Sequence, residues 1–140
     1  MNNTANTSAT TGFESFFLQD TSRLDIELPN GEPMLYDGKQ VVAVLHGPAT
    51  DVYVKAKEAM EKETTRRVFA AMGAKKKKGE EEDKEADQKF LTAVTAGFEH
   101  FPYPGGPAAV YQERRLQYIT DQVRRHLADL GNFFGKPSKT

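Results

Sequence analysis

The stretch LQYITDQVRRHLADLGNFF, residues 116–134, decides the fold. Its apolar residues recur at steps of three and four, as one stripe of an α-helix requires; they are Leu116, Ile119, Val123, Leu127 and Leu130. The polar residues between them suit the solvent side. Because an apolar stripe of this size is unfavourable in water, we expect other parts of the chain to cover it.

The overall composition fits one soluble domain. The chain has 140 residues, of which 38% are hydrophobic, and its 19 Lys and Arg nearly balance its 20 Asp and Glu. This balance argues against a general nucleic-acid binder and against a polybasic membrane anchor. Without cysteine there is no disulfide, thiolate metal site or cysteine nucleophile, which is compatible with a reducing cytoplasm. We see no secretory signal and no apolar run of ~20 residues.

The two ends of the chain differ in composition from its middle. Residues 1–12 and 135–140 are polar, so we expect a disordered and a loose tail around a single α+β domain at 13–134. Three phenylalanines follow the first tail: Phe13, Phe16 and Phe17. We expect them to pin that tail onto the domain; the alternative is a partner-binding motif.

Alternating residues predict strands in the first half of this domain. Leu24, Ile26 and Leu28 alternate with acidic residues, which is typical of a half-buried strand. Turn signals follow at Asn30-Gly31 and Asp37-Gly38. The apolar residues 40–46 predict a second strand. Two arrangements stay open: a three-stranded meander with a short strand at 34–36, or one antiparallel hairpin with residues 29–39 as an elaborate tip.

Helical spacing predicts three α-helices after the strands, at about 50–73, 84–98 and 110–131. Between the first two lies a flexible charged linker, residues 74–83, in which four lysines precede four acidic residues. We interpret it as solvated, because adjacent opposite charges cancel their field within a Debye length of ~8 Å. The prolines and glycines of residues 101–107 predict a constrained loop.

No local signature of catalysis or metal binding occurs. His46, His100 and His126 lie far apart in the sequence and form no zinc-binding pair. The serines at positions 8, 15, 22 and 138 lie in tail-like or linking segments with no base candidate nearby. We therefore predict no enzyme activity, no catalytic residue, no cofactor and no metal.

The order of the motifs in LDIELPNGEPMLYDGKQVVAVLHGPATDVYVKA resembles the amino-terminal half of phage tail assembly chaperones of long-tailed phages and prophages. The features shared are an alternating strand (residues 24–28), two glycine turns (30–33 and 37–39) and a valine-rich strand (41–45). A Gly-Pro (47–48) then precedes a helix with an early tyrosine, Tyr53. The carboxyl half is similar through Ile119, Gln122, Val123, Asp129, Asn132 and Phe133. The resemblance covers about residues 16–134. An Asp-Ser cap after the Gly-Pro and a tryptophan in the second half, both expected in the family, are missing.

The resemblance implies a non-catalytic assembly factor in the cytoplasm of the host bacterium. Such proteins coat the long, mostly helical tape-measure protein until tail-tube subunits polymerise around it. The implied partners are the tape-measure protein and, in addition, tail-tube subunits and further copies of the chain, with neither nucleic acid nor membrane. Two other functions stay open: a structural tail component retained in the virion, or a small nucleic-acid-binding regulator using residues 75–78 and the arginines of the last helix.

Aromatic residues in the loop and at the end of the last helix are the candidate partner contacts, because the expected core needs them least. They are Phe101, Tyr103, Phe133 and Phe134. For the last two, a plug that folds back onto the helix end is the alternative.

Overall fold

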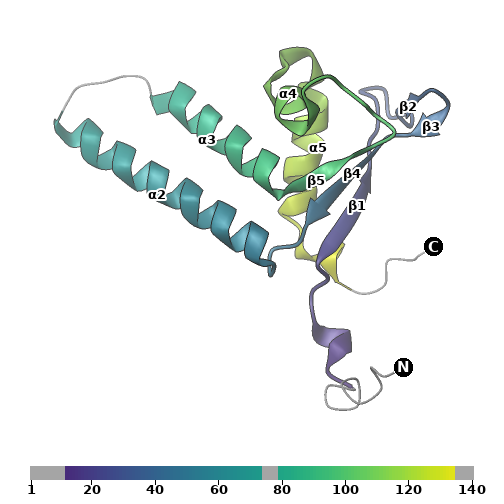
Figure 1. Ribbon diagram of the computed structural model, residues 1–140, viewed down its shortest axis with the longest axis horizontal. Coiled ribbons are helices and arrows are strands. Elements are labelled where there is room, and N and C mark those ends of the chain that lie inside the picture. Colours follow the sequence, from purple (N-terminus) through teal and green to yellow (C-terminus); the bar gives the residue numbers. More distant parts are fainter. Residues whose placement is uncertain (1–11, 74–78, 135–140) are drawn as a thin grey trace.

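The computed structural model of the chain describes residues 12–73 and 79–134 (Figure 1). The expected tails, apart from Gly12, and the four lysines of the linker lie outside these residues. The described elements are η1 (Glu14–Phe16), β1 (Thr21–Asp25), β2 (Leu35–Tyr36), β3 (Lys39–Gln40), β4 (Val42–His46), α2 (Asp51–Gly73), α3 (Gly79–Val94), β5 (Thr95–Glu99), α4 (Gly106–Gln112), η2 (Arg114–Leu116), α5 (Gln117–Leu127) and η3 (Leu130–Phe133). The expected α+β class is therefore observed.

Three strands form an antiparallel sheet in the order β1-β4-β5, and β2 and β3 form a separate two-stranded ribbon. Strand β1 pairs directly with β4, from Thr21 opposite His46 to Asp25 opposite Val42. The ribbon belongs to the connection between them, which is tied back where the Met34 amide donates to the Ile26 carbonyl at 2.9 Å. Of the two arrangements expected from the sequence, the hairpin with an elaborate tip is the one observed.

The third strand, β5, was not expected. Residues 95–98 were assigned to the end of a helix, and this assignment is wrong: α3 ends at Val94, and β5 pairs with the other side of β4. The reason is tertiary, since β4 is largely buried in the middle of the sheet and needs hydrogen-bond partners on both sides. Gly97 and Thr95 have low helix propensity, so ending the helix before them costs little free energy.

Of the other two predicted helices, one is confirmed and one differs from the structure at its ends and in continuity. The first helix, expected at 50–73, is confirmed by α2. The linker is shorter than expected, because α3 already begins at Gly79. The helix expected at 110–131 is interrupted at Glu113, whose extended backbone separates α4 from η2. The Glu113 carboxylate accepts a hydrogen bond from the Arg115 amide at 3.0 Å and so caps the new turn.

The hydrophobic core lies between the sheet and three helices. Helix α5 contributes Ile119, Val123 and Leu127, which are buried as the stripe predicts, whereas Leu130 is exposed. They share one cluster with side chains of the hairpin, α3, α4 and η3, namely Ile26, Val41, Ala43, Leu45, Leu91, Val94, Val110, Tyr111 and Phe133. The Tyr111 hydroxyl lies 2.7 Å from Thr95 Oγ1, and burial raises the pKa of Tyr111 to about 12. This contact ties α4 to β5.

Helices α2 and α3 form an antiparallel pair that projects from this body (Figure 1). Near the body, the rings of Tyr53 and Phe90 meet edge to face with their centroids 5.3 Å apart. Thr50 caps α2 by accepting from the Tyr53 amide at 3.2 Å. Further along, most described side chains of α2 are exposed. We call this helix pair the α2–α3 arm.

Gly47 joins the sheet to the arm in a place where no side chain fits. It is buried, its amide donates to the Asp20 carbonyl at 2.7 Å, and an added Cβ would overlap the Gln19 carbonyl oxygen. We expect Gly47→Ala to lower the free energy of unfolding by about 1–3 kcal/mol, the usual cost of overpacking. Gly97→Ala is the matched control, because a Cβ there meets nothing within 4 Å. Urea denaturation followed by circular dichroism measures both, and equal losses would contradict the packing described.

Candidate functional site

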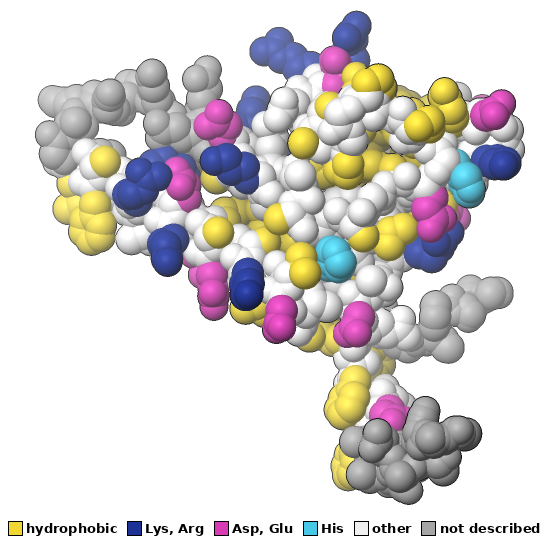
Figure 2. Space-filling view, viewed as in Figure 1, with side chains coloured by type: hydrophobic (Ala, Val, Ile, Leu, Met, Phe, Trp, Pro, Cys, Tyr) yellow, Lys and Arg dark blue, Asp and Glu magenta, His cyan; other side chains and the backbone are white. Residues whose placement is uncertain are grey.

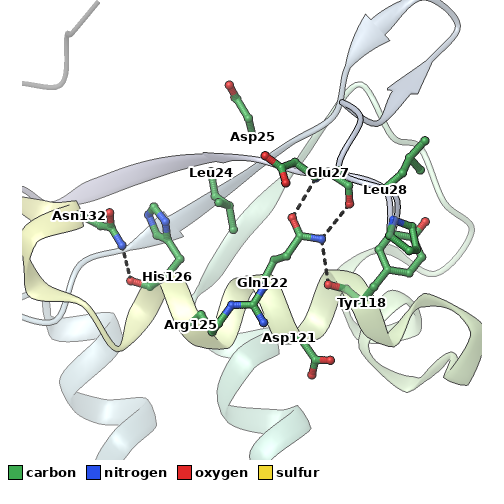
Figure 3. A pocket seen from close by; sticks show the side chains of 12 residues that line it. Leu24, Asp25, Glu27, Leu28, Tyr118, Asp121, Gln122, Arg125, His126 and Asn132 are labelled. Carbon is green, nitrogen blue, oxygen red and sulfur yellow. Dashed lines mark hydrogen bonds between the residues drawn. The ribbon is translucent and has the colours of Figure 1, made fainter.

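A groove separates the outer edge of β1 from α5 (Figure 3). We call it the β1–α5 groove; its volume is about 480 Å³. Its lining comes from β1 and the segment after it, from α5 and from η3, which are distant in sequence. Leu24 and Tyr118 provide apolar lining, and Asp25, Glu27 and Arg125 provide charge.

Gln122 of α5 holds one end of this groove together. Its Nε2 donates to the Glu27 carbonyl at 2.8 Å, and its Oε1 accepts from the Glu27 amide at 2.9 Å. One side-chain amide thus satisfies both backbone groups of Glu27, as a neighbouring strand would do. Figure 3 shows this pair of hydrogen bonds between α5 and the backbone that follows β1.

At the other end, Ser22 of β1 meets His126 of α5. Ser22 Oγ lies 2.7 Å from His126 Nε2, although the two residues are 104 positions apart. The expectation that no base candidate lies near this serine, and that the serine belongs to a linking segment, is therefore wrong. Tertiary packing alone produces the contact, so no local motif could have indicated it.

The direction of this hydrogen bond does not suit a serine nucleophile that is activated by a histidine general base. The Ser22 hydroxyl donates its hydrogen to the Asn132 carbonyl at 2.9 Å, so Nε2–H of His126 must donate to Ser22 Oγ. A general base would instead accept the hydroxyl proton. Burial lowers the pKa of His126, which favours the neutral ring. The observed role of the pair is to fasten η3 to β1.

Two of the predicted partner contacts, Phe101 and Tyr103, lie together. Their rings stack at a centroid distance of 5.7 Å, and the Phe101 ring meets Tyr36 edge to face at 6.0 Å. Both rings are half-buried against the margin of the core. Both rings therefore pack against the core and remain partly exposed to solvent.

The other two predicted contacts, Phe133 and Phe134, lie at the opposite end of the sheet. The Phe133 ring is wholly buried, so its expected role as an accessible contact is wrong and the plug is the arrangement observed. Its carbonyl accepts from the Gln19 amide at 2.7 Å, next to the start of β1. The Phe134 ring is 48% exposed. The four aromatics therefore do not form one surface.

Phe13, Phe16 and Phe17 do not pin the chain onto the domain. Their side chains are 62%, 70% and 55% exposed, and the segment that carries them leads away from the body (Figure 1). The expected packing is wrong, because more than half of the surface of each of these residues is exposed. They are instead an exposed aromatic group close to the start of β1.

A second exposed apolar group lies at the far end of the α2–α3 arm. Val68, Phe69 and Met72 are 55%, 67% and 75% exposed. Because Met72 is four residues from Val68 and three from Phe69, and both spacings place side chains on one side of a helix, the three form one patch. Figure 2 shows hydrophobic side chains at this end of the arm. We call it the α2 apolar patch.

Comparison with known proteins finds no relative. The chain matches no protein-family model, no curated protein and no solved structure. None of the helices in the described parts of the chain has both the length and the apolar composition needed to cross a membrane.

The two adjacent phenylalanines give a matched test of the plug. We expect Phe133→Ala to lower the free energy of unfolding by about 3–5 kcal/mol, because it leaves a cavity in the core. Phe134→Ala should cost less than about 1 kcal/mol, since its ring is already half in water. Chemical denaturation of both variants checks this, and a larger loss for Phe134→Ala would contradict the buried position of Phe133.

The His126 contact predicts a pH dependence of stability. Its folded pKa is lower than its unfolded one, so the unfolded chain binds the proton more readily. The contribution is present above the unfolded pKa of about 6.5 and is lost as the pH falls through the folded pKa. We expect His126→Gln, which keeps a donor for Ser22, to weaken the loss of stability between about pH 7 and pH 5. Denaturation curves at several pH values measure this; identical pH profiles would rule it out.

Proposed function

We propose that this chain is a non-catalytic tail assembly chaperone that binds the helical tape-measure protein of a phage or prophage. The order of the sequence motifs favours this family, and one structural observation carries the proposal: the α2 apolar patch stands exposed on a projecting arm. The site of action in this proposal is the cytoplasm of the host bacterium. Tail-tube subunits and further copies of the chain are the other proposed partners.

The α2 apolar patch lies where its side chains contribute little to the hydrophobic core. A turn of polar residues, 62–67, lies between the patch and the inner part of α2, where Tyr53 meets Phe90. In this turn the exposed Arg66 pairs with the half-buried Glu63 at 2.8 Å. Apolar side chains beyond such a turn contribute little to the core, so their exposure is best explained by a partner that covers them.

The spacing of the patch suits a helical partner. Side chains at positions i, i+1 and i+4 of one helix offer the anchors that an amphipathic helix packs against. Fully burying a large apolar side chain stabilises a complex by roughly 1.5–3 kcal/mol, and association itself costs about 4–15 kcal/mol. One patch is therefore a weak site. Many copies along one long client would hold it through avidity and still release it stepwise.

The predicted aromatic contacts have a secondary place in this proposal. Phe101, Tyr103 and Phe134 keep accessible ring surface and can touch a client or a neighbouring copy. Phe133 is not among them, because its ring lies in the core.

The double substitution Phe69→Ser with Met72→Ser tests the client site. We expect co-purification with a co-expressed tape-measure protein to fall at least tenfold, because most of the patch is lost. The thermal midpoint should change by less than about 2 °C, since both side chains are largely in water. Leu130→Ser is the control, as it removes an apolar side chain that is 56% exposed and lies outside the arm.

Two results would count against the proposal. Unchanged capture of the tape-measure protein by the double variant would remove the α2 apolar patch as its site. Stoichiometric recovery of the chain from purified virions, measured by mass spectrometry, would identify a structural tail component instead.

A further inference from the structure

The outer edge of β1 has backbone groups that the fold leaves open. The Ile26 amide donates to the Val41 carbonyl at 3.0 Å, and the Gly47 amide donates to the Asp20 carbonyl at 2.7 Å. These bonds show that even-numbered residues of this strand face β4. Because an antiparallel ladder alternates, Thr21, Arg23 and Asp25 direct their N–H and C=O groups away from the sheet.

Among the described residues, partners close this edge at both ends but not in the middle. At position 19 the amide donates to the Phe133 carbonyl at 2.7 Å, and at position 27 both backbone groups pair with Gln122. A loop carbonyl and a side-chain amide thus take the places of a neighbouring strand. Between them lies the open stretch of β1, whose residues Leu24 and Asp25 line the β1–α5 groove. The open stretch is short, as in proteins that keep their edges from pairing indiscriminately.

The space beside this edge suits a lone extended segment and not a second folded copy. Gln122 reaches the outward groups of Glu27, which places α5 beneath the edge (Figure 3). A strand added to β1 lies about 4.8 Å away, whereas two packed helices need about 8–10 Å between their axes. A second copy paired through β1 would bring its own α5 into the space that the first α5 occupies.

The side chains around the edge favour a basic partner. Arg23 is engaged by Glu99 through two bonds of 2.7 and 2.8 Å, and Arg124 pairs with Asp87 and Asp121. Among the residues that line the groove, Asp25, Glu27 and Asp121 are acidic and Arg125 is the one arginine. Burial lowers the pKa of the nearby His126, which disfavours its cationic form. The field at this edge is therefore negative.

Side chains of an added strand would point alternately into the groove and to the solvent side, and this determines which residues fit at each position. A residue opposite Leu24 would point into the groove, where Leu24 and Tyr118 provide apolar surface. Its two neighbours would lie on the solvent side, one opposite Asp25 and one opposite Arg23, whose charge is paired with Glu99. The fitting segment therefore alternates basic and apolar residues.

We propose that the edge of β1 binds an extended segment of another polypeptide, with alternating basic and apolar residues, as an additional strand. The backbone groups of Thr21, Arg23 and Asp25 provide the hydrogen bonds, and the β1–α5 groove accepts the apolar side chain. This site is separate from the α2 apolar patch, and it does not depend on the proposed tape-measure client.

The experiment titrates the ¹⁵N-labelled full chain with the acetylated, amidated pentapeptide Lys-Val-Lys-Val-Lys. We expect saturable shifts of the backbone amides of Thr21, Arg23 and Asp25, and at least tenfold slower hydrogen exchange at Arg23 and Asp25. The peptide Glu-Val-Glu-Val-Glu has the same pattern with the opposite charge, and it should bind at least tenfold more weakly.

A pair of variants separates backbone pairing from charge. Asp25→Ala and Asp25→Pro both lose the carboxylate, but only the proline also loses the outward N–H, and it leaves the ladder with β4 intact. We expect the lysine peptide to bind Asp25→Pro at least tenfold more weakly than Asp25→Ala. If Asp25→Pro fails to fold, Thr21→Pro against Thr21→Ala makes the same comparison, because the Thr21 amide also faces outward.

Three outcomes would overturn the inference. These are equal affinity for the proline and alanine variants, peptide-induced shifts confined to residues outside β1 and α5, and no saturable binding at millimolar peptide. Protection of the Arg23 and Asp25 amides that grows with protein concentration in the absence of peptide would also overturn it, since a second copy would then occupy the edge.

Discussion

Packing of the apolar stripe of α5 against the inner face of the hairpin is the interaction on which the rest of the structure depends. Ile119 and Val123 are fully buried in one cluster with Ile26, Val41 and Leu45. Each partner has one apolar side, so neither is stable in water without the other. Helices α3 and α4 and the Phe133 ring complete the same cluster. The charged side chains of the sheet, including the Arg23–Glu99 pair, face solvent.

The same packing determines the shape of the β1–α5 groove. Helix α5 lies beneath the edge of β1, where Gln122 and His126 reach backbone and side-chain groups of the strand. These polar contacts are satisfied on both sides, which a half-buried site requires. They also divide the edge into protected ends and an open middle. The groove is thus a consequence of how the helix is fastened, and its residues come from both ends of the chain.

Unlike the body, the outer part of the α2–α3 arm contributes little to the hydrophobic core. Its inner part is tied to the body through Tyr53 and Phe90, and its outer part has polar residues and then the α2 apolar patch. A helix whose far end contributes little to the core can change its surface at small cost in stability. For this reason substitutions can alter a partner-binding surface on the arm without disturbing the core. The arm and the β1–α5 groove are separate surfaces with different chemistry, one apolar and helical, the other acidic and extended.

What the sequence alone determined was local. Residue periodicity predicted a strand over 24–28, which overlaps β1 only at Leu24 and Asp25, as well as the helix that is α2 and the buried stripe of α5, because those patterns depend on neighbours a few positions away. Tertiary structure decided the rest. β5 is a strand because β4, some fifty residues earlier, has an open side. Phe133 is buried and Phe134 is not because only the first ring faces the cluster beneath Gly47. Ser22 meets His126, and Glu27 meets Gln122, only when α5 lies along β1. Such contacts depend on where distant segments pack, and a pattern of neighbouring residues does not contain that information.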